Sequence, residues 1–315
     1  MKINNENTVS DQKDIANRVD IKEIVSDLWE GKWIIIASTV LTALITVFYS
    51  LSIPNIYKSE VLLAPVQETT SGGISGIANQ FGGLASLAGV NLSNASGDKV
   101  TIALELLKSR QFIGEFIDTY ELKATLLAVK GWDQQTNTLI FDTSVYDVEQ
   151  NLWVRDVKAP KKPEPSYLEA HKYFVKEVLS VGRDKETGLI TASVKHVSPI
   201  IAQSILTKLI ESVNSSMRQS DIADAQKSID YLNDALTKTS VADMQQVFYQ
   251  LIEKQQQTKM LASIRDEYVL EVIDPAIVAE EKVGPKRALM CVISVFFGGL
   301  IGVALVLTRK FLGFN

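Results

Sequence analysis

The sequence predicts an α+β protein in which two transmembrane helices flank a membrane-proximal mixed α/β base domain that carries a long helical arm. Three observations predict this class. Two runs of 21 residues without a charge lie at residues 33–53 and 288–308. Short apolar segments bounded by turn residues lie between these runs, and the 40 residues that start at Pro199 contain no further proline and no glycine.

Each uncharged run is long enough to cross a bilayer. At 1.5 Å per residue, a helix of this length spans about 31 Å, which matches the hydrocarbon core. Helices in the core of soluble proteins are rarely so long without a charge. The first run follows 32 mostly polar residues and has no A-x-A sequence after it. We therefore interpret it as an uncleaved anchor and not as a signal peptide.

Two spans place both ends of the chain on one side of the membrane and the segment between them on the other. The expected division is a tail with a short interfacial helix at residues 1–32, an outer domain at 54–287 and a second tail at 309–315. In the first tail, Asp20 and Glu23 have the spacing of a capping box. Basic residues flank the two sides in similar numbers, so charge alone does not orient the protein.

The first part of the outer domain predicts a strand, an excursion and a helix. Residues 55–66, "NIYKSEVLLAPV", have the composition of a strand. Residues 68–97 are rich in glycine, serine and alanine, and we expect a mobile excursion with one or two short helices. Apolar residues at helical spacing predict one helix over 99–120, whereas 121–166 is irregular apart from the short strand "NTLIFDTSVY".

A hairpin and a returning strand complete the base. The turn sequence "RDKETG" precedes the alternating segment "LITASVKH" at residues 189–196, and Gly188 closes the turn. The segment "DEYVLEVIDP" at 266–275 predicts a strand that returns toward the membrane. We expect these two strands to be neighbours in one sheet.

We expect the arm at residues 199–262, between the two parts of a base at 54–198 and 263–287. The arm starts with one helix from Pro199 to Lys238. Proline suits a first helical turn, and a helix of 40 residues reaches about 60 Å. Its second half has apolar residues at alternating spacings of three and four. This pattern predicts a coiled-coil-like seam for association with neighbouring copies: Ile222, Ala225, Ile229, Leu232 and Leu236.

A polar stretch interrupts the arm helix. An earlier apolar seam is separated from the later one by "NSSMRQSD" at residues 214–221, which we expect to be polar on every face. An elongated domain that packs on neighbours tolerates such a helix better than a compact globule. Ser240 is expected to cap a second helix over 241–262 whose apolar residues share one face: Met244, Val247, Phe248, Leu251 and Ile252.

The sequence contains no recognisable catalytic, metal-binding or cofactor-binding motif. His171 and His196 are the only histidines, Cys291 is the only cysteine, and neither HExxH nor a P-loop occurs. Two acidic pairs that resemble glycosidase carboxylates are expected to be solvated: Asp142 with Asp147, and Glu280 with Glu281. A net charge of −5 does not favour nucleic-acid binding. We therefore expect a protein that is not an enzyme and has no cofactor.

Small residues recur every four positions in both uncharged runs. The second run carries Ser294, Gly298 and Gly302, and the first carries a matching row of hydroxyl residues: Ser38, Thr42, Thr46 and Ser50. Because lipid is as apolar as leucine, membrane helices associate where small residues let their backbones come close. The two rows predict helix packing, either with the other span of the same chain or with a neighbouring copy.

Several stretches resemble the Wzz chain-length determinants, the class 1 polysaccharide co-polymerases. These are "VDIKEIVSDLWEGKW" before the first span, "IPNIYKSEVLLAPV" after it, and "VFYQLIEKQQQTKMLASIRDEYVLEVIDPA" late in the outer domain. "GPKRALMCVISVFFGGLIG" resembles the second-span motif of the family, although the segment 276–284 lacks a further proline that the family often has. The residues that fall on this motif are Pro275, Pro285, Lys286, Gly298, Gly299 and Gly302.

The resemblance implies a multi-pass protein of the bacterial inner membrane with a periplasmic outer domain and both termini in the cytoplasm. Members of this family form homo-oligomers and catalyse nothing. They set the chain length of lipopolysaccharide O-antigen, or of a related surface glycan, that a separate O-antigen polymerase builds from lipid-linked polysaccharide.

Three other functions remain open. A capsule or exopolysaccharide co-polymerase adaptor would have similar topology and would activate a separate cytoplasmic tyrosine autokinase. A membrane sensor would need an internal signalling module, and only 32 and 7 residues are expected on that side. An enzyme acting on glycan would need the convergent polar cluster that the sequence does not indicate.

Overall fold

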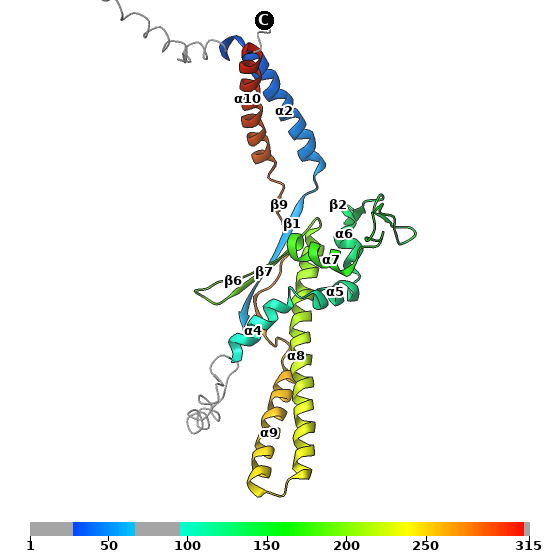
Figure 1. The fold of residues 1–315 in the computed structure, drawn as a ribbon, viewed down its shortest axis with the longest axis vertical. Coiled ribbons are helices and arrows are strands. Elements are labelled where there is room, and N and C mark those ends of the chain that lie inside the picture. Colours follow the sequence, from blue (N-terminus) through cyan, green and yellow to red (C-terminus); the bar gives the residue numbers. More distant parts are fainter. Residues whose placement is uncertain (1–27, 67–94, 312–315) are drawn as a thin grey trace, which may run out of the picture. The chain divides into compact units, whose positions relative to one another are not determined.

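The structure, a computed structural model, describes residues 28–66 and 95–311. These residues form two compact units (Figure 1). One contains the helices near the two ends of the chain, and the other is the outer unit, residues 54–283. The capping box expected at Asp20 and Glu23 lies outside the described residues, as does most of the excursion expected at 68–97.

The first unit contains the two candidate membrane helices, α2 (Lys32–Ser52) and α10 (Arg287–Phe311). Both are long and apolar enough to cross a membrane, with mean hydropathies of 2.2 and 2.6. Their large apolar side chains are mostly exposed, as lipid-facing side chains would be. The structure thus has helices where the sequence predicts spans at 33–53 and 288–308.

The outer unit is built on an antiparallel sheet of five strands. These are β1 (Ile56–Pro65), β6 (Leu179–Arg183), β7 (Ile190–His196), β8 (Leu270–Asp274) and β9 (Lys282–Gly284), in the order β6-β7-β1-β8 with β9 also paired to β1. The expectation that the strands at 189–196 and 266–275 are neighbours is wrong, because β1 lies between them.

The burial pattern of β1 is compatible with its central position in the sheet. Ser59, Val61 and Leu63 are buried, whereas Glu60 between them is exposed. A strand whose buried residues alternate in this way can pair on both edges while one face covers the core. The local hairpin prediction is confirmed: β6 pairs with β7, and Gly188 in the turn has a φ of 73°, which favours glycine.

Residues 95–120 form two helices, so the single helix expected at 99–120 is wrong. α4 (Ala95–Leu106) ends at a short break, and α5 (Arg110–Thr119) follows. Ser109 explains the break, because its hydroxyl accepts a hydrogen bond from the Phe112 backbone N–H and caps α5. The break allows Leu107 and Phe112 both to reach the core.

The region expected to be irregular, 121–166, contains several short elements. α6 (Leu122–Leu127) is followed by two small hairpins, β2 (Val129–Asp133) with β3 (Thr138–Phe141), and β4 (Tyr146–Asp147) with β5 (Leu152–Trp153). α7 (Tyr167–Tyr173) continues into a π-helical turn at Phe174–Val178. Only the segment at β3 carries the alternation that sequence analysis detects.

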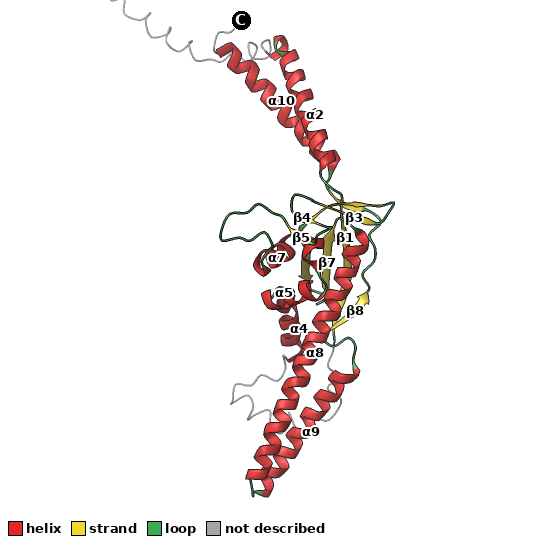
Figure 2. Cartoon of the chain, turned by 90° about the vertical axis from the view of Figure 1, so that its right-hand side faces the viewer, coloured by secondary structure: helices red, strands yellow, loops and turns green. Residues whose placement is uncertain are grey.

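The arm consists of α8 (Pro199–Lys238) and α9 (Ala242–Ile264), which lie side by side (Figure 2). The prediction of one helix from Pro199 to Lys238 is confirmed. Ser240 is not the cap of α9, because Val241 occupies that position and contributes no side-chain hydrogen bond.

The first half of α8 completes the core of the outer unit. It packs against β1 and β7, and its inward residues are fully buried: Ala202, Ile205, Leu206, Leu209 and Val213. The arm is therefore a continuation of a core helix, since the same α8 that covers the sheet extends beyond it to meet α9.

Candidate functional site

The two candidate membrane helices pack through their small residues. The Ser38 hydroxyl on α2 donates to the Gly298 carbonyl oxygen on α10 at 3.0 Å. Thr42 has three carbonyl acceptors within reach: those of Ser38 and Thr39 at 3.0 Å, and that of Ser294 at 3.5 Å. A hydroxyl has one proton, and the shorter contacts lie on its own helix. Ser38 is therefore the main hydrogen-bond link between the helices.

The glycines of α10 allow the two backbones to touch. A Cβ at Gly298 would lie 2.0 Å from Thr42 Oγ1 and 2.9 Å from Thr39 Cα. A Cβ at Gly302 would lie 2.7 Å from Ile35 Cα. Backbone atoms cannot give way as the end of a side chain can, so both positions require glycine in this packing.

Not every glycine of the second-span motif takes part in this packing. A Cβ at Gly299 would lie 3.9 Å from Thr39 Oγ1, which is an ordinary van der Waals distance. Pro275 follows β8, and Pro285 and Lys286 precede α10. The motif therefore combines two positions that need close approach with others that do not.

Arg287 closes the other end of the helix pair. In the sequence it stands out only as a charge that flanks the second span. Arg287 at the start of α10 donates from Nε to the Ser50 carbonyl oxygen at 3.2 Å and from Nη2 to the Ile53 carbonyl oxygen at 3.3 Å. These carbonyls lie at the C-terminus of α2, where a cation is favourable. Ser50 is buried and Thr46 half-buried on the same helix.

The seam expected to join neighbouring copies is covered within the chain. Ala225, Ile229 and Leu232 are buried in the single chain, and Ile222 and Leu236 are half-buried. Because α9 packs against α8, these residues stabilise a helical hairpin within the chain, for which an apolar stripe at this spacing is suited. The contact of this seam with neighbouring copies stays a prediction.

The apolar residues of α9 are divided between two faces. Phe248 and Ile252 are half-buried, whereas Met244, Val247 and Leu251 are exposed, with Val247 at 48%. The exposed residues are spaced three and four apart and form one row on the helix. We call Met244, Val247 and Leu251 the outer row of the arm.

The sequence predicts that residues 214–221 of α8 are polar on every face. The structure instead buries one side of this stretch, at Asn214 and Met217. The Asn214 side chain accepts from the backbone N–H groups of Val269 and Leu270 at 2.9 and 3.0 Å and donates to the Leu270 carbonyl at 2.8 Å. It thus completes the hydrogen bonding of the start of β8.

A second polar contact holds the root of the arm. The Tyr268 hydroxyl donates to Asp221 on α8 at 2.5 Å, and Lys99 of α4 forms an ion pair with the same carboxylate at 3.0 Å. Burial and the hydrogen bond to Asp221 raise the pKa of Tyr268 to about 12. Tyr268 therefore keeps its proton and its donor role at all physiological pH values.

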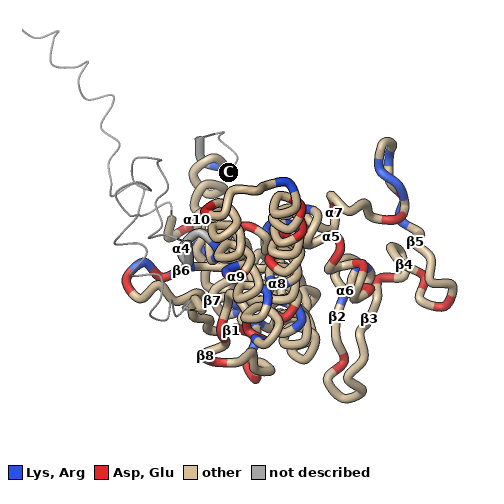
Figure 3. Tube along the Cα trace, turned by 90° about the horizontal axis from the view of Figure 1, so that it is seen from below, with Lys and Arg blue, Asp and Glu red and all other residues tan. Residues whose placement is uncertain are grey.

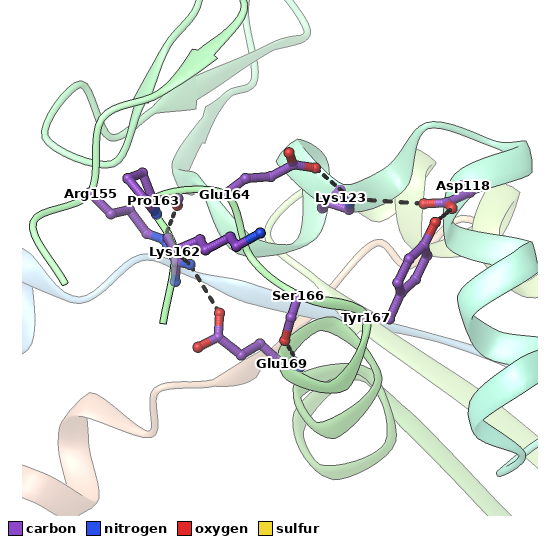
Figure 4. Close-up of polar contacts among 9 residues, drawn as sticks. All are labelled: Asp118, Lys123, Arg155, Lys162, Pro163, Glu164, Ser166, Tyr167 and Glu169. Atoms are coloured by element: carbon purple, nitrogen blue, oxygen red, sulfur yellow. Dashed lines mark hydrogen bonds and ion pairs between the residues drawn. The ribbon is translucent and has the colours of Figure 1, made fainter. Parts of the chain in front are cut away.

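A polar network ties the basic loop after β5 to α5, α6 and α7. Figure 3 shows Lys and Arg positions in blue along this loop, and Figure 4 shows the contacts. Arg155 donates to the Pro163 carbonyl at 2.7 Å and to Glu169 at 2.9 Å. Its hydrogen bond lowers the pKa of the Glu169 carboxyl. Lys123 pairs with Glu164 at 2.8 Å, and this bond raises the Lys123 pKa.

The two histidines and the acidic residues Asp142 and Asp147 make local structural hydrogen bonds. His171 contacts the Lys108 carbonyl at 2.8 Å, and His196 contacts the Thr125 carbonyl at 3.0 Å, which confirms that both are hydrogen-bonded. Asp142 and Asp147 accept from backbone N–H groups in their own turns. In the described part of the chain, no three His, Cys, Asp or Glu side chains are placed to hold a metal ion.

Comparison with known families identifies the first third of the chain. Residues 17–120 match the family described as "Wzz: Chain length determinant protein". This match covers about a third of the chain. A second match covers residues 236–311, with the "G-rich domain on putative tyrosine kinase". The Wzz match includes α2 and β1, and the G-rich match includes α9, β8 and α10. The two matches therefore lie on either side of the first part of the arm.

The individual proteins that match this chain are distant relatives. It is 28% identical over 126 residues to the tyrosine-protein kinase etk of Escherichia coli strain K12, which covers 38% of this chain and 16% of that kinase. The same identity is found with the etk kinase of strain O157:H7. The chain thus spans only 16% of the length of the curated kinases it matches.

Two solved polysaccharide co-polymerases are also similar to this chain. A full-length bacterial polysaccharide co-polymerase aligns with 92% of this chain and 98% of its own, at 13% identity and a TM-score of 0.39. A fragment of WzzB, a polysaccharide co-polymerase from Salmonella Typhimurium, aligns with 73% of this chain and all of its own, at 12% identity and a TM-score of 0.32. The similarity to the Wzz family rests on the match over residues 17–120 and not on these alignments.

Proposed function

We propose that the protein is a non-catalytic regulator of surface-glycan chain length in the bacterial inner membrane. Lipopolysaccharide O-antigen is the glycan that the family resemblance favours. The observation that carries this proposal is the Wzz match over residues 17–120, which includes the first candidate span and the first strand of the outer unit. The protein acts as a scaffold for a separate polymerase and its lipid-linked polysaccharide, without a cofactor.

In this proposal both termini are cytoplasmic and the outer unit lies in the periplasm. The paired helices α2 and α10 support an arrangement in which the chain crosses the membrane twice, because their small residues pack on each other. A cysteine at exposed Lys158 should react with a membrane-impermeant thiol reagent added to the periplasm, and one at Asn7 should not, both in a Cys291→Ser background. Equal labelling at both positions would contradict this topology.

The same proposal includes a homo-oligomer. The outer row of the arm supports it, since Met244, Val247 and Leu251 form an exposed apolar row on α9 and such rows usually have a partner. A second copy is the occupant that the family resemblance favours. Replacing Val247 and Leu251 with glutamate should reduce the mass of the detergent-solubilised particle. An unchanged mass would place the contact between copies elsewhere.

The function is tested by electrophoresis of surface polysaccharide from cells that lack the protein. A regulator of chain length leaves polymer present but broadens its length distribution. Loss of all polymer would indicate an enzyme or an essential export component instead, and an unchanged distribution would remove the proposal.

A second candidate function is that of an adaptor for a separate cytoplasmic tyrosine kinase. The observation that favours it is the match of residues 236–311 to a G-rich domain on putative tyrosine kinases, together with the similarity to etk. An adaptor predicts that deleting the protein lowers phosphotyrosine on a cytoplasmic kinase and abolishes capsule. The regulator of O-antigen length predicts neither change.

A further inference from the structure

An open cleft of about 610 Å³ lies in the outer unit beside the network of Figure 4. It lies where the junction of α5 and α6 meets the β4–β5 hairpin and the loop before α7. Its lining includes two aromatic residues, Tyr146 and Trp153, and several side chains with hydrogen-bonding groups: Asp118, Glu121, Lys123, Asn151 and Glu164. Neither helix packing nor the proposed scaffold role requires these groups to face a common space.

The aromatic wall of the cleft is held in place. The Trp153 ring is half-buried and lies 5.1 Å from the ring of Tyr146, which is itself 9% exposed. The Arg155 guanidinium lies 5.8 Å from the Trp153 ring centroid, and Arg155 is fixed by Pro163 and Glu169. A ring supported in this way offers a rigid apolar surface with little conformational entropy left to lose.

The polar wall is also fixed before any ligand arrives. Lys123 Nζ lies 2.8 Å from Glu164 and 3.9 Å from Asp118, and Asp118 accepts a hydrogen bond from Tyr167. The Asn151 side chain accepts from the Tyr146 hydroxyl. Donors and acceptors thus line the same cleft as Trp153, as a ligand with several hydroxyls requires.

The backbone of the cleft is unusual at two positions. Glu121 and Asn151 have φ values of 52° and 54°, in the left-handed region. Asparagine tolerates this region, but the Glu121 side chain makes no capping hydrogen bond there, and the conformation costs roughly 1 kcal/mol. Backbone strain of this kind is concentrated at functional sites, and here both residues line the same cleft.

We propose that this cleft binds one sugar unit of the polysaccharide, with the ring stacked on Trp153 and its hydroxyls bonded to Asp118, Asn151 and Glu164. A sugar ring has an apolar C–H face and a rim of groups that both donate and accept, which matches an aromatic surface beside carboxylates, an amide and an ammonium. This inference rests on the proposed function, because it names the substrate class that the scaffold would contact.

The charges of the cleft define which sugars suit it. Asp118, Glu121 and Glu164 contribute three carboxylates, and Lys123 contributes one positive charge. A sugar acid would be repelled by the net negative charge, whereas a neutral or amino sugar would not. The cleft therefore selects for uncharged or basic sugar units over uronic acids.

The test is a titration of the full-length protein in nanodiscs, followed by ligand-observed NMR. The probes are the neutral repeat-unit oligosaccharide cut from the polysaccharide of the source cells and a trimer of galacturonic acid. We expect saturable binding of the repeat unit and binding of the acidic trimer that is at least about tenfold weaker. Equal or tighter binding of the acidic trimer would overturn the charge preference, and no saturable binding of the repeat unit would overturn the site.

Trp153→Ala should weaken binding of the repeat unit by about tenfold or more, whereas Trp153→Phe should retain most of it. Trp132→Ala is the matched control, because Trp132 packs edge-on against Tyr57 at 5.8 Å and does not line the cleft. Equal binding by Trp153→Ala and the control would overturn the proposal. If Trp153→Ala unfolds early, Asp118→Asn and Glu164→Gln take its place, and unchanged affinity in both would overturn it.

Experiments in cells distinguish the cleft proposal from the proposed function on which it rests. If deletion of the protein alters glycan length while Trp153→Ala supports normal length and does not change binding, only the cleft proposal fails. If deletion leaves glycan length unchanged, the proposed function fails whatever the binding results are. A Trp153→Ala strain with altered glycan length and normal protein amount supports both.

Discussion

Ser38 of α2 donates its hydroxyl proton to the carbonyl oxygen of Gly298 on α10 at 3.0 Å, across 260 residues of sequence. This bond can form because residue 298 has no side chain to separate the helices. In a bilayer there is no hydrophobic force between helices, so such close contacts and hydrogen bonds decide whether two spans associate. The pairing of α2 and α10 therefore depends on positions 298 and 302 more than on any apolar residue.

Alanine at Gly298 or Gly302 should destabilise the helix pair by about 1–3 kcal/mol, because each new methyl group would overlap backbone atoms of α2. Gly299→Ala is the matched control, since its Cβ would lie 3.9 Å from Thr39 Oγ1. The measurement is the fraction of detergent-solubilised protein that stays folded over a temperature ramp. Equal loss in all three variants would show that the effect does not arise at the helix contact.

Proline at Ala225 should cost about 3 kcal/mol or more, because Ala225 is buried in the middle of α8 and proline removes a helical hydrogen bond. Proline at Ala242 is the control. Ala242 is the first residue of α9, and Val241 before it has an extended conformation that proline permits. Urea unfolding followed by circular dichroism compares the two. A harmless Ala225→Pro would mean that α8 is not one continuous helix in solution.

Asn214→Leu should lower the free energy of unfolding by about 1–3 kcal/mol. The substitution leaves the buried N–H groups of Val269 and Leu270 without their acceptor. Ser215→Ala, in the same polar stretch, removes a half-buried hydroxyl and should change stability by a few tenths of a kcal/mol. Chemical unfolding of both variants measures the difference. Similar values would mean that water replaces Asn214 at the start of β8.

His196 makes the outer unit sensitive to acid. Burial lowers the pKa of His196 below the ordinary value of 6.5, and the bond to the Thr125 carbonyl opposes this effect more weakly. A neutral His196 accepts from the Ser198 N–H at 3.1 Å, at the residue that caps α8. Because its pKa is lower in the folded state, its contribution to stability is present above pH 6.5 and is lost as the pH falls below that value.

The measurement is urea unfolding at pH 8 and pH 5. Wild-type protein should lose stability on acidification, and His196→Asn should lose less of it. His171→Gln is the control and should behave like wild type, because His171 lies on a half-exposed helix surface. A wild-type pH dependence that persists in His196→Asn would assign it to other groups.

Sequence patterns predicted the long helices well and the sheet order poorly. α8 has the expected bounds, because a run without helix breakers after a serine and a proline is a local signal. The placement of β1 between β7 and β8 is a long-range choice that no local pattern encodes. The break at Ser109 was missed because apolar spacing continues across it, although serine is a common cap.

Residue spacing predicts the small-residue rows but does not predict which helix each row contacts. The structure brings the two rows of one chain together. Arg287 and Asn214 were missed for a different reason. Each acts through backbone groups of a distant segment, and backbone groups leave no trace in the sequence. The cleft at Trp153 was missed because its lining comes from four separate segments.

The most direct test of the proposed control of chain length is the length distribution of the surface glycan, measured beside the amount of inserted protein. The strains compared carry the wild-type protein, no protein, or the double variant Gly298→Leu with Gly302→Leu. We expect a narrow distribution with the wild type, a broad one without the protein, and a broad one with the variant at normal protein amount. A narrow distribution in the strain without the protein would contradict the proposed function. A narrow distribution with the variant would contradict the role of the helix contact.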